Sequence, residues 1–175
     1  MDREKIEKEL RRNRSTLVVV GMGVIAFGAW SVVKTVLMLT LRPGLSPAAF
    51  DTDYPYSDET LMYHIFYYGF IALFLLFDLL LRLFVGLNAR REGLGGKKGV
   101  AYIVLACLLA AVSLVGNTAG LITIKDGVNA SVNGGYGDLV MSLLVEITAT
   151  VTLIELIVAA VRVKRLERIA SAQEV

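Results

Sequence analysis

The chain has 175 residues, of which 55% are hydrophobic and 19% are charged, and its 18 Lys and Arg against 16 Asp and Glu leave a formal net charge of +2. Soluble domains carry about 45–50% apolar and about 25% charged residues, so a soluble enzyme, a disordered regulator and a basic nucleic-acid-binding protein are excluded. The apolar excess lies in four blocks, each longer than the roughly 20 residues that span a bilayer as a helix. The sequence therefore predicts an all-α integral membrane protein, a bundle of four transmembrane helices with a short interfacial helix before the first.

Residues 1–16 form a charged segment before the first apolar block. Its six bases and four acids include Glu4 with Lys8 and Glu7 with Arg11, and both pairs have the i,i+4 spacing that stabilises a helix. We expect a short cytoplasmic helix next to the membrane. Because the acids weaken the attraction of the bases to anionic lipid, we interpret this helix first as a solvated extension of the chain, with lipid binding as the alternative.

The four predicted spans are residues 17–41, 61–87, 100–122 and 139–161. The first span is too long for the roughly 7–15-residue apolar core of a cleavable signal peptide, so we expect it to stay in the mature protein. The segments between the spans show no second domain. Residues 1–175 are therefore predicted to form one membrane domain.

Lys and Arg are distributed unevenly over the segments outside the spans. Residues 1–16 hold six, residues 88–99 hold four and the tail from Arg162 holds four, whereas residues 42–60 and 123–137 hold one each. Basic residues concentrate in cytoplasmic loops. We therefore expect a multi-pass protein of the plasma or inner membrane, with both termini and the loop at 88–99 in the cytoplasm.

Glycines recur in the first and third spans. Gly21 and Gly23 formally match a dinucleotide-binding fingerprint, but that motif needs a strand-to-helix turn and here lies inside a membrane-length apolar block. Together with Gly28, they are expected to allow close approach between helices. Gly116 and Gly120 have the G-x-x-x-G spacing of helix-packing faces in membranes, which we interpret first as packing within the chain and alternatively as packing between two copies.

Five ionisable side chains fall inside the spans: Lys34, Asp78, Arg82, Glu146 and Glu155. Such a group costs roughly 2.5–3.5 kcal/mol at the bilayer centre on insertion scales, and it usually faces a partner inside the protein. Counting about 1.5 Å per residue places Lys34 and Glu146 at matching depth in the outer half and the other three in the inner half. The simplest interpretation is structural, with Lys34 paired to Glu146, and Arg82 paired to Asp78 or Glu155.

An ion or proton path is the alternative interpretation of the same residues. At about 100° per residue, His64, Asp78 and Arg82 share one face of the second span, which gives a polar stripe from the outer to the inner side. Asn117 in the third span lies in the same outer half as His64. A stripe of this kind suits a path across the membrane, and it equally suits a helix packed against a partly polar core.

Residues 77–84 of the second span combine Phe77 and Asp78 with Arg82 four residues later. This pattern resembles the second helix of voltage-sensor domains, where an aromatic residue and an acid precede a base in a helix that runs from outside to inside. The family's fourth helix carries arginines at every third residue, whereas the fourth span here has Glu146 and Glu155. The resemblance therefore implies a similar four-helix arrangement at most.

No set of residues at one depth combines a nucleophile with a base, so no catalytic residues are predicted. His64 is the only histidine, which argues against a histidine-rich metal site, and no cofactor is expected. The leading hypothesis is a non-enzymatic bundle that binds a membrane protein partner or a second copy of itself in the lipid bilayer, with no nucleic-acid partner. A small ion- or proton-coupled transporter or channel is the alternative, and a lipid-modifying enzyme ranks third.

Overall fold

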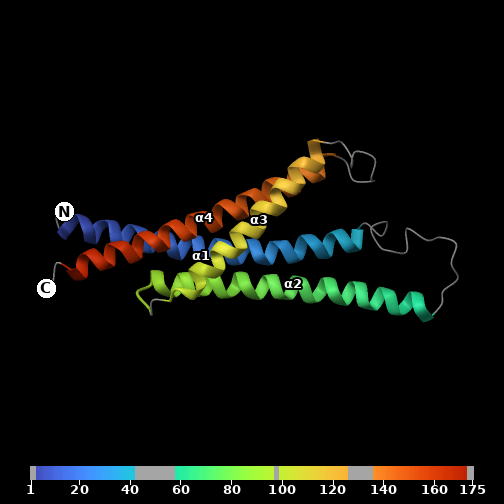
Figure 1. Cartoon of the computed structure of the whole chain (residues 1–175), viewed down its shortest axis with the longest axis horizontal. Helices are drawn as coiled ribbons and strands as arrows, with labels where there is room; N and C mark the ends of the chain where they lie inside the picture. Colours follow the sequence, from blue (N-terminus) through green and yellow to red (C-terminus); the bar gives the residue numbers. More distant parts are fainter. Residues whose placement is uncertain (1–2, 42–57, 97–98, 126–135, 173–175) are drawn as a thin grey trace. The chain divides into compact units, whose positions relative to one another are not determined.

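The computed structural model describes residues 3–41, 58–96, 99–125 and 136–172 (Figure 1). These residues form four helices and contain no strand: α1 (Arg3–Leu41), α2 (Asp58–Gly93), α3 (Ala101–Lys125) and α4 (Tyr136–Ala172). Each helix contains a stretch long and apolar enough to cross a membrane, namely Glu4–Leu37, Ile65–Gly93, Ala101–Ile122 and Met141–Ala172. The prediction of an all-helical protein with four transmembrane-capable helices is confirmed.

The helices extend beyond the predicted spans. The charged segment at residues 1–16 is not a separate short helix, because its described part continues into the first apolar block as α1. The junction contains no proline or glycine, and the Thr16 hydroxyl donates a hydrogen bond to the Arg12 carbonyl at 3.0 Å. Ile6 is only 2% exposed, so this part of α1 packs against the protein. α4 likewise continues through its basic tail to Ala172.

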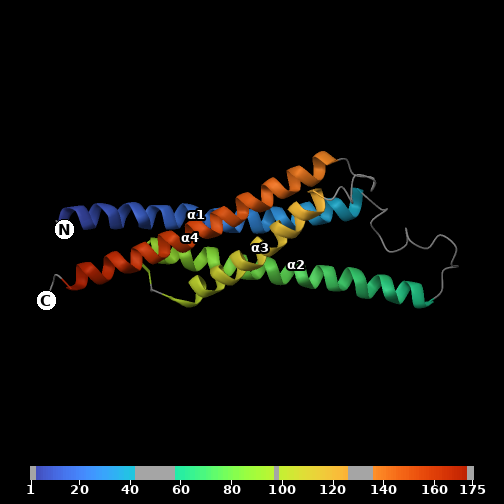
Figure 2. The ribbon, with the colours of Figure 1, turned by 45° about the horizontal axis from the view of Figure 1, so that its top comes forward.

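The chain divides into two compact units. Unit 1 comprises residues 1–24 and 84–175, and unit 2 comprises residues 25–83. Unit 1 contains α3, α4 and one end each of α1 and α2, and in it α3 and α4 lie side by side (Figures 1 and 2). Four alanines of these two helices are buried, and small side chains let the backbones of membrane helices approach closely; they are Ala106, Ala110, Ala159 and Ala160.

Within unit 1, glycines bring α1 and α2 into backbone contact. A Cβ atom at Gly21 would lie 2.9 Å from the Gly86 carbonyl oxygen and 3.2 Å from the Arg90 nitrogen. A Cβ atom at Gly93 would lie 2.8 Å from the Arg14 carbonyl oxygen. The close approach expected at Gly21 is present, and Gly93 adds a second contact of the same kind.

Large apolar side chains cover much of the outer surface of the helices. In α2, Phe66, Phe70 and Phe74 are 68%, 70% and 64% exposed. Soluble monomers rarely expose large contiguous apolar patches, whereas lipid tails solvate such side chains without cost. The distribution therefore fits a multi-pass membrane protein.

Candidate functional site

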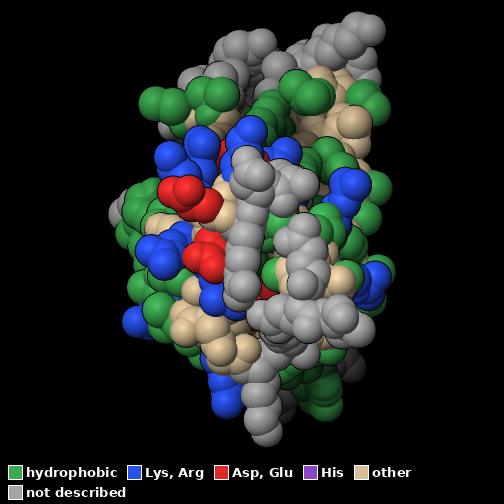
Figure 3. Space-filling model, turned by 90° about the vertical axis from the view of Figure 1, so that its left-hand side faces the viewer, with side chains coloured by type: hydrophobic (Ala, Val, Ile, Leu, Met, Phe, Trp, Pro, Cys, Tyr) green, Lys and Arg blue, Asp and Glu red, His purple; other side chains and the backbone are tan. Residues whose placement is uncertain are grey.

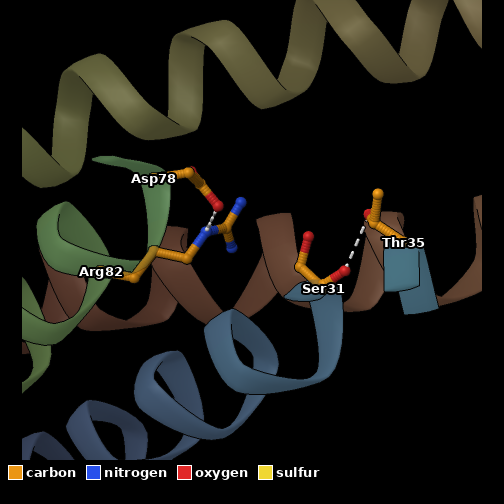
Figure 4. A network of polar contacts seen from close by, with 4 residues as sticks. All are labelled: Ser31, Thr35, Asp78 and Arg82. Carbon is orange, nitrogen blue, oxygen red and sulfur yellow. Dashed lines mark hydrogen bonds and ion pairs between the residues drawn. The ribbon is translucent and has the colours of Figure 1, made fainter. Parts of the chain in front are cut away.

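In unit 2, a charged pair lies in the middle of α2. Arg82 Nε donates to Asp78 Oδ2 at 2.9 Å, and the side chains are 14% and 24% exposed, respectively (Figure 4). The pair spans one helical turn, as the i,i+4 spacing allows. α1 makes room for it at Gly28, where a Cβ atom would lie 3.0 Å from Arg82 Cδ. The arginine stem therefore rests on the α1 backbone while its charge is matched by Asp78.

Two hydroxyl side chains of α1 accompany this pair. Figure 4 shows Ser31 and Thr35 on α1 beside Asp78 and Arg82 of α2. Thr35 Oγ1 donates to the Ser31 carbonyl at 3.0 Å, which satisfies the hydroxyl within its own helix. The Thr35 hydroxyl therefore donates its hydrogen bond within α1 and not to the charged pair.

The two residues of the predicted outer ion pair, Lys34 and Glu146, belong to different units. Lys34 is half-buried in unit 2, and Glu146 is exposed in unit 1. Their pairing stays a prediction. His64 belongs to α2, and its side chain lies outside the described residues.

In unit 1, a buried amide links α3 to α4. Asn117 is 7% exposed and Thr150 is 3% exposed. Asn117 Nδ2 donates to Thr150 Oγ1 at 2.9 Å, and the Thr150 hydroxyl donates to the Glu146 carbonyl at 2.8 Å. The threonine hydroxyl therefore accepts one hydrogen bond and donates another, which ties the two helices together at this level.

The two glycines of the G-x-x-x-G motif have different surroundings. A Cβ atom at Gly120 would lie 3.2 Å from Leu143 Cδ1 of α4, whereas a Cβ atom at Gly116 would have no described atom within 4 Å apart from its chain neighbours and the nearby backbone of its own helix. Gly120 thus allows α3 to approach α4, in line with packing inside the chain. Gly116 is exposed on α3.

The end of unit 1 where α1 begins and α4 ends holds a buried polar cluster to which each helix contributes one side chain. Arg14 Nη2 donates to Glu167 Oε1 at 2.7 Å. Glu92 and Tyr102 are 2% and 1% exposed, and the carboxylates of Glu92 and Glu167 act electrostatically on the Tyr102 hydroxyl. Both Glu92 oxygens and the Tyr102 hydroxyl are buried. We call Arg14, Glu92, Tyr102 and Glu167 the terminal cluster.

Sequence reasoning missed the terminal cluster because it ended the second span at residue 87 and assigned Glu92 to a loop. α2 continues to Gly93, and Val85, Ala89 and Glu92 follow the i, i+4, i+7 spacing of one helix face. All three are buried. Extending the helical periodicity past the last apolar residue would have placed Glu92 on the buried face.

Two grooves flank α4 at the same end of unit 1. The α1–α4 groove, of about 780 Å³, carries bases and acids together, among them Arg12, Arg162 and Glu155. The α3–α4 groove, of about 600 Å³, is lined by Lys164, Arg165 and Arg168 with apolar side chains and no acid. Viewed from this end, Lys and Arg side chains lie among Asp and Glu side chains (Figure 3).

Neither a metal-ligand cluster nor a known relative assigns a chemistry to this chain. Among the described residues, no three His, Cys, Asp or Glu side chains are grouped to hold a metal ion. No family model, no curated protein and no solved structure matches the chain. The polar side chains and the two grooves are therefore the features that bear on function.

Proposed function

We propose that this chain is a non-enzymatic, multi-pass protein of the cell membrane that binds another membrane protein or a second copy of itself, and that the polar groups inside its spans are structural. One observation carries the proposal. Two pairs of polar side chains in the middle of the described helices bond to each other within a unit, namely Asp78 with Arg82 and Asn117 with Thr150.

Polar side chains that bond to each other in this way favour a structural role over a transport role. Separating Asp78 from Arg82 would leave two charges uncompensated in a medium of low polarity, and breaking such a pair is strongly unfavourable. An ion or proton passing along α2 would have to break it. The Asn117–Thr150 hydrogen bond likewise occupies the side chains that an outer binding site would use.

The exposure of Glu155 supports contact with another chain. This glutamate is exposed on α4 within the stretch Met141–Ala172, and it lines the α1–α4 groove together with Arg12 and Arg162. A carboxylate that faces lipid tails is costly, so ionisable groups in spans face protein or water. Glu155 meets this requirement in the α1–α4 groove, and a polar side chain of a partner or of a second copy would enter the same groove.

The proposed orientation follows from the basic residues. We place the end of unit 1 with the terminal cluster and both grooves at the cytoplasmic side of the membrane, because residues 1–16, 88–99 and the tail from Arg162 hold most of the Lys and Arg. Unit 2, residues 25–83, carries few Lys and Arg residues.

Reconstituted into liposomes under an imposed pH gradient and membrane potential, the wild-type protein is expected to show no proton or ion flux above protein-free liposomes. Glu155→Gln is the informative variant, because an exposed amide keeps the shape of the side chain and loses its titration. The measurement is a pH-sensitive dye inside the liposomes, with an added ionophore as the control that the gradient exists. A wild-type flux that Glu155→Gln abolishes at unchanged thermal stability would overturn the proposal in favour of a transporter or channel.

A further inference from the structure

The α3–α4 groove concentrates positive charge beside an apolar wall. Arg165 and Arg168 are exposed on α4, and Lys164 lies between α4 and the beginning of α3. The groove contains no acidic side chain. Arg165 also lines the α1–α4 groove, which contains Glu9 and Glu155, whereas Arg168 and Lys164 line the α3–α4 groove alone.

The beginning of α3 adds to the positive potential in the groove. The Lys164 ammonium donates a hydrogen bond to the Gly99 carbonyl, which holds it beside the first turn of α3. The carbonyl of Val100 accepts the first bonds of the helix, from the Ile103 and Val104 nitrogens. The N–H groups that precede them point out of the helix, and they carry the positive end of its dipole.

The apolar wall continues from the bases towards the spans. Val100, Ile103 and Val161 line the groove on the side where α3 and α4 enter their apolar stretches. Arg165 and Arg168 lie one to two turns beyond Val161 on α4. A ligand that fills the groove would therefore meet bases at one end and hydrocarbon side chains at the other.

We propose that the α3–α4 groove is a binding site for an anionic glycerophospholipid. The phosphate would lie between Arg165, Arg168 and the beginning of α3, and an acyl chain would follow Ile103 and Val161. Basic pockets between membrane helices on the cytoplasmic side suit such headgroups. This inference goes beyond the proposed function, since it requires only that α3 and α4 cross a bilayer and holds whether or not the bundle binds another protein.

The charge pattern favours a lipid over a free phosphate. A free anion would use the bases alone, whereas the groove places apolar side chains against them in one volume of about 600 Å³. Burial of apolar surface contributes roughly 25 cal/mol per Å², so acyl contacts would add to the electrostatic attraction. Deacylated headgroup should therefore bind more weakly than intact lipid.

The test is native mass spectrometry of the full-length protein, delipidated in detergent and mixed with phosphatidylglycerol or phosphatidylcholine. The wild type is expected to retain phosphatidylglycerol in preference to phosphatidylcholine. The double variant Arg165→Gln/Arg168→Gln should bind phosphatidylglycerol about thirtyfold more weakly, since each base near an anionic lipid contributes roughly fivefold. Arg165→Lys/Arg168→Lys should restore most of the preference, which shows that the loss does not come from misfolding.

Arg90→Gln/Arg91→Gln is the matched control, because it removes two exposed arginines at the end of α2 that do not line the groove. It should leave phosphatidylglycerol binding unchanged. Equal retention of the two lipids by the wild type would overturn the proposal, and so would equal losses in the two glutamine variants. Deacylated glycerophosphoglycerol that competes as well as intact lipid would show an anion site without an acyl contact, which also contradicts it.

Discussion

Replacing Arg14 with methionine is expected to lower the free energy of unfolding by about 1–3 kcal/mol, between the values for exposed and for buried ion pairs. The Arg14 side chain is 34% exposed and the Glu167 side chain only 10%, with 2.7 Å between their charged atoms. Without the guanidinium, the Glu167 carboxylate keeps the cost of burial and loses this ion pair. Unfolding in mixed micelles by a denaturing detergent measures the loss.

The Arg14→Met/Glu167→Leu double variant is expected to be more stable than Arg14→Met alone, because it removes both charges of the Arg14–Glu167 pair. Arg11→Met serves as the matched control on the same helix, since Arg11 is exposed, and it should change the free energy of unfolding by less than about 0.5 kcal/mol. Glu167→Leu is measured alone as well. If the losses in free energy of unfolding of Arg14→Met and Glu167→Leu add up in the double variant, the two side chains do not stabilise each other.

Gly21→Ala is expected to destabilise the protein by about 1–3 kcal/mol, the usual cost of overpacking. The new methyl group would lie 2.9 Å from the Gly86 carbonyl oxygen and 3.2 Å from the Arg90 nitrogen. Both are backbone atoms of α2, so neither can move aside as a flexible side chain would. α1 and α2 would have to separate at this crossing, which also loosens the contact at Gly93.

Gly69→Ala is the matched control for this prediction. Gly69 lies in α2, where no described atom comes within 4 Å of an added Cβ atom. Alanine is the better helix former by up to about 1 kcal/mol, so this variant should be neutral or slightly stabilised. Comparable destabilisation by Gly21→Ala and Gly69→Ala would mean that the loss at Gly21 does not come from the helix crossing.

The sequence predicted the four helices because each span is a long apolar run whose length alone indicates a membrane helix. It placed the helix ends less well, since α1 and α4 extend through charged segments that contain no helix-breaking residue at the junction. The terminal cluster was missed for the same reason. Glu92 lies past the last apolar residue of its span, where hydropathy no longer reports burial and only helical periodicity does.

Depth along a helix was also easier to predict than direction around it. Counting residues placed Asp78 and Arg82 one turn apart, and their spacing alone allows the contact at 2.9 Å. It could not indicate that Asn117 is bonded to Thr150, because that contact depends on which faces of α3 and α4 meet. The sequence could not predict the α3–α4 groove either, since its lining combines residues from the beginning of α3 with residues from the last turns of α4.

The measurement that tests the account most directly is the topology of the chain in intact cells. On a Cys107→Ala background, cysteines introduced at Ser57 and Ser131 are expected to react with a membrane-impermeant thiol reagent added outside. A cysteine at Leu94, which is 70% exposed, should react only after the membrane is permeabilised. Leu94 is preferable to Gly95, whose φ of 88° disfavours a side chain. Labelling of Leu94→Cys from outside, or protection of Ser57→Cys and Ser131→Cys, would contradict four spans with the terminal cluster and both grooves at the cytoplasmic side of the membrane.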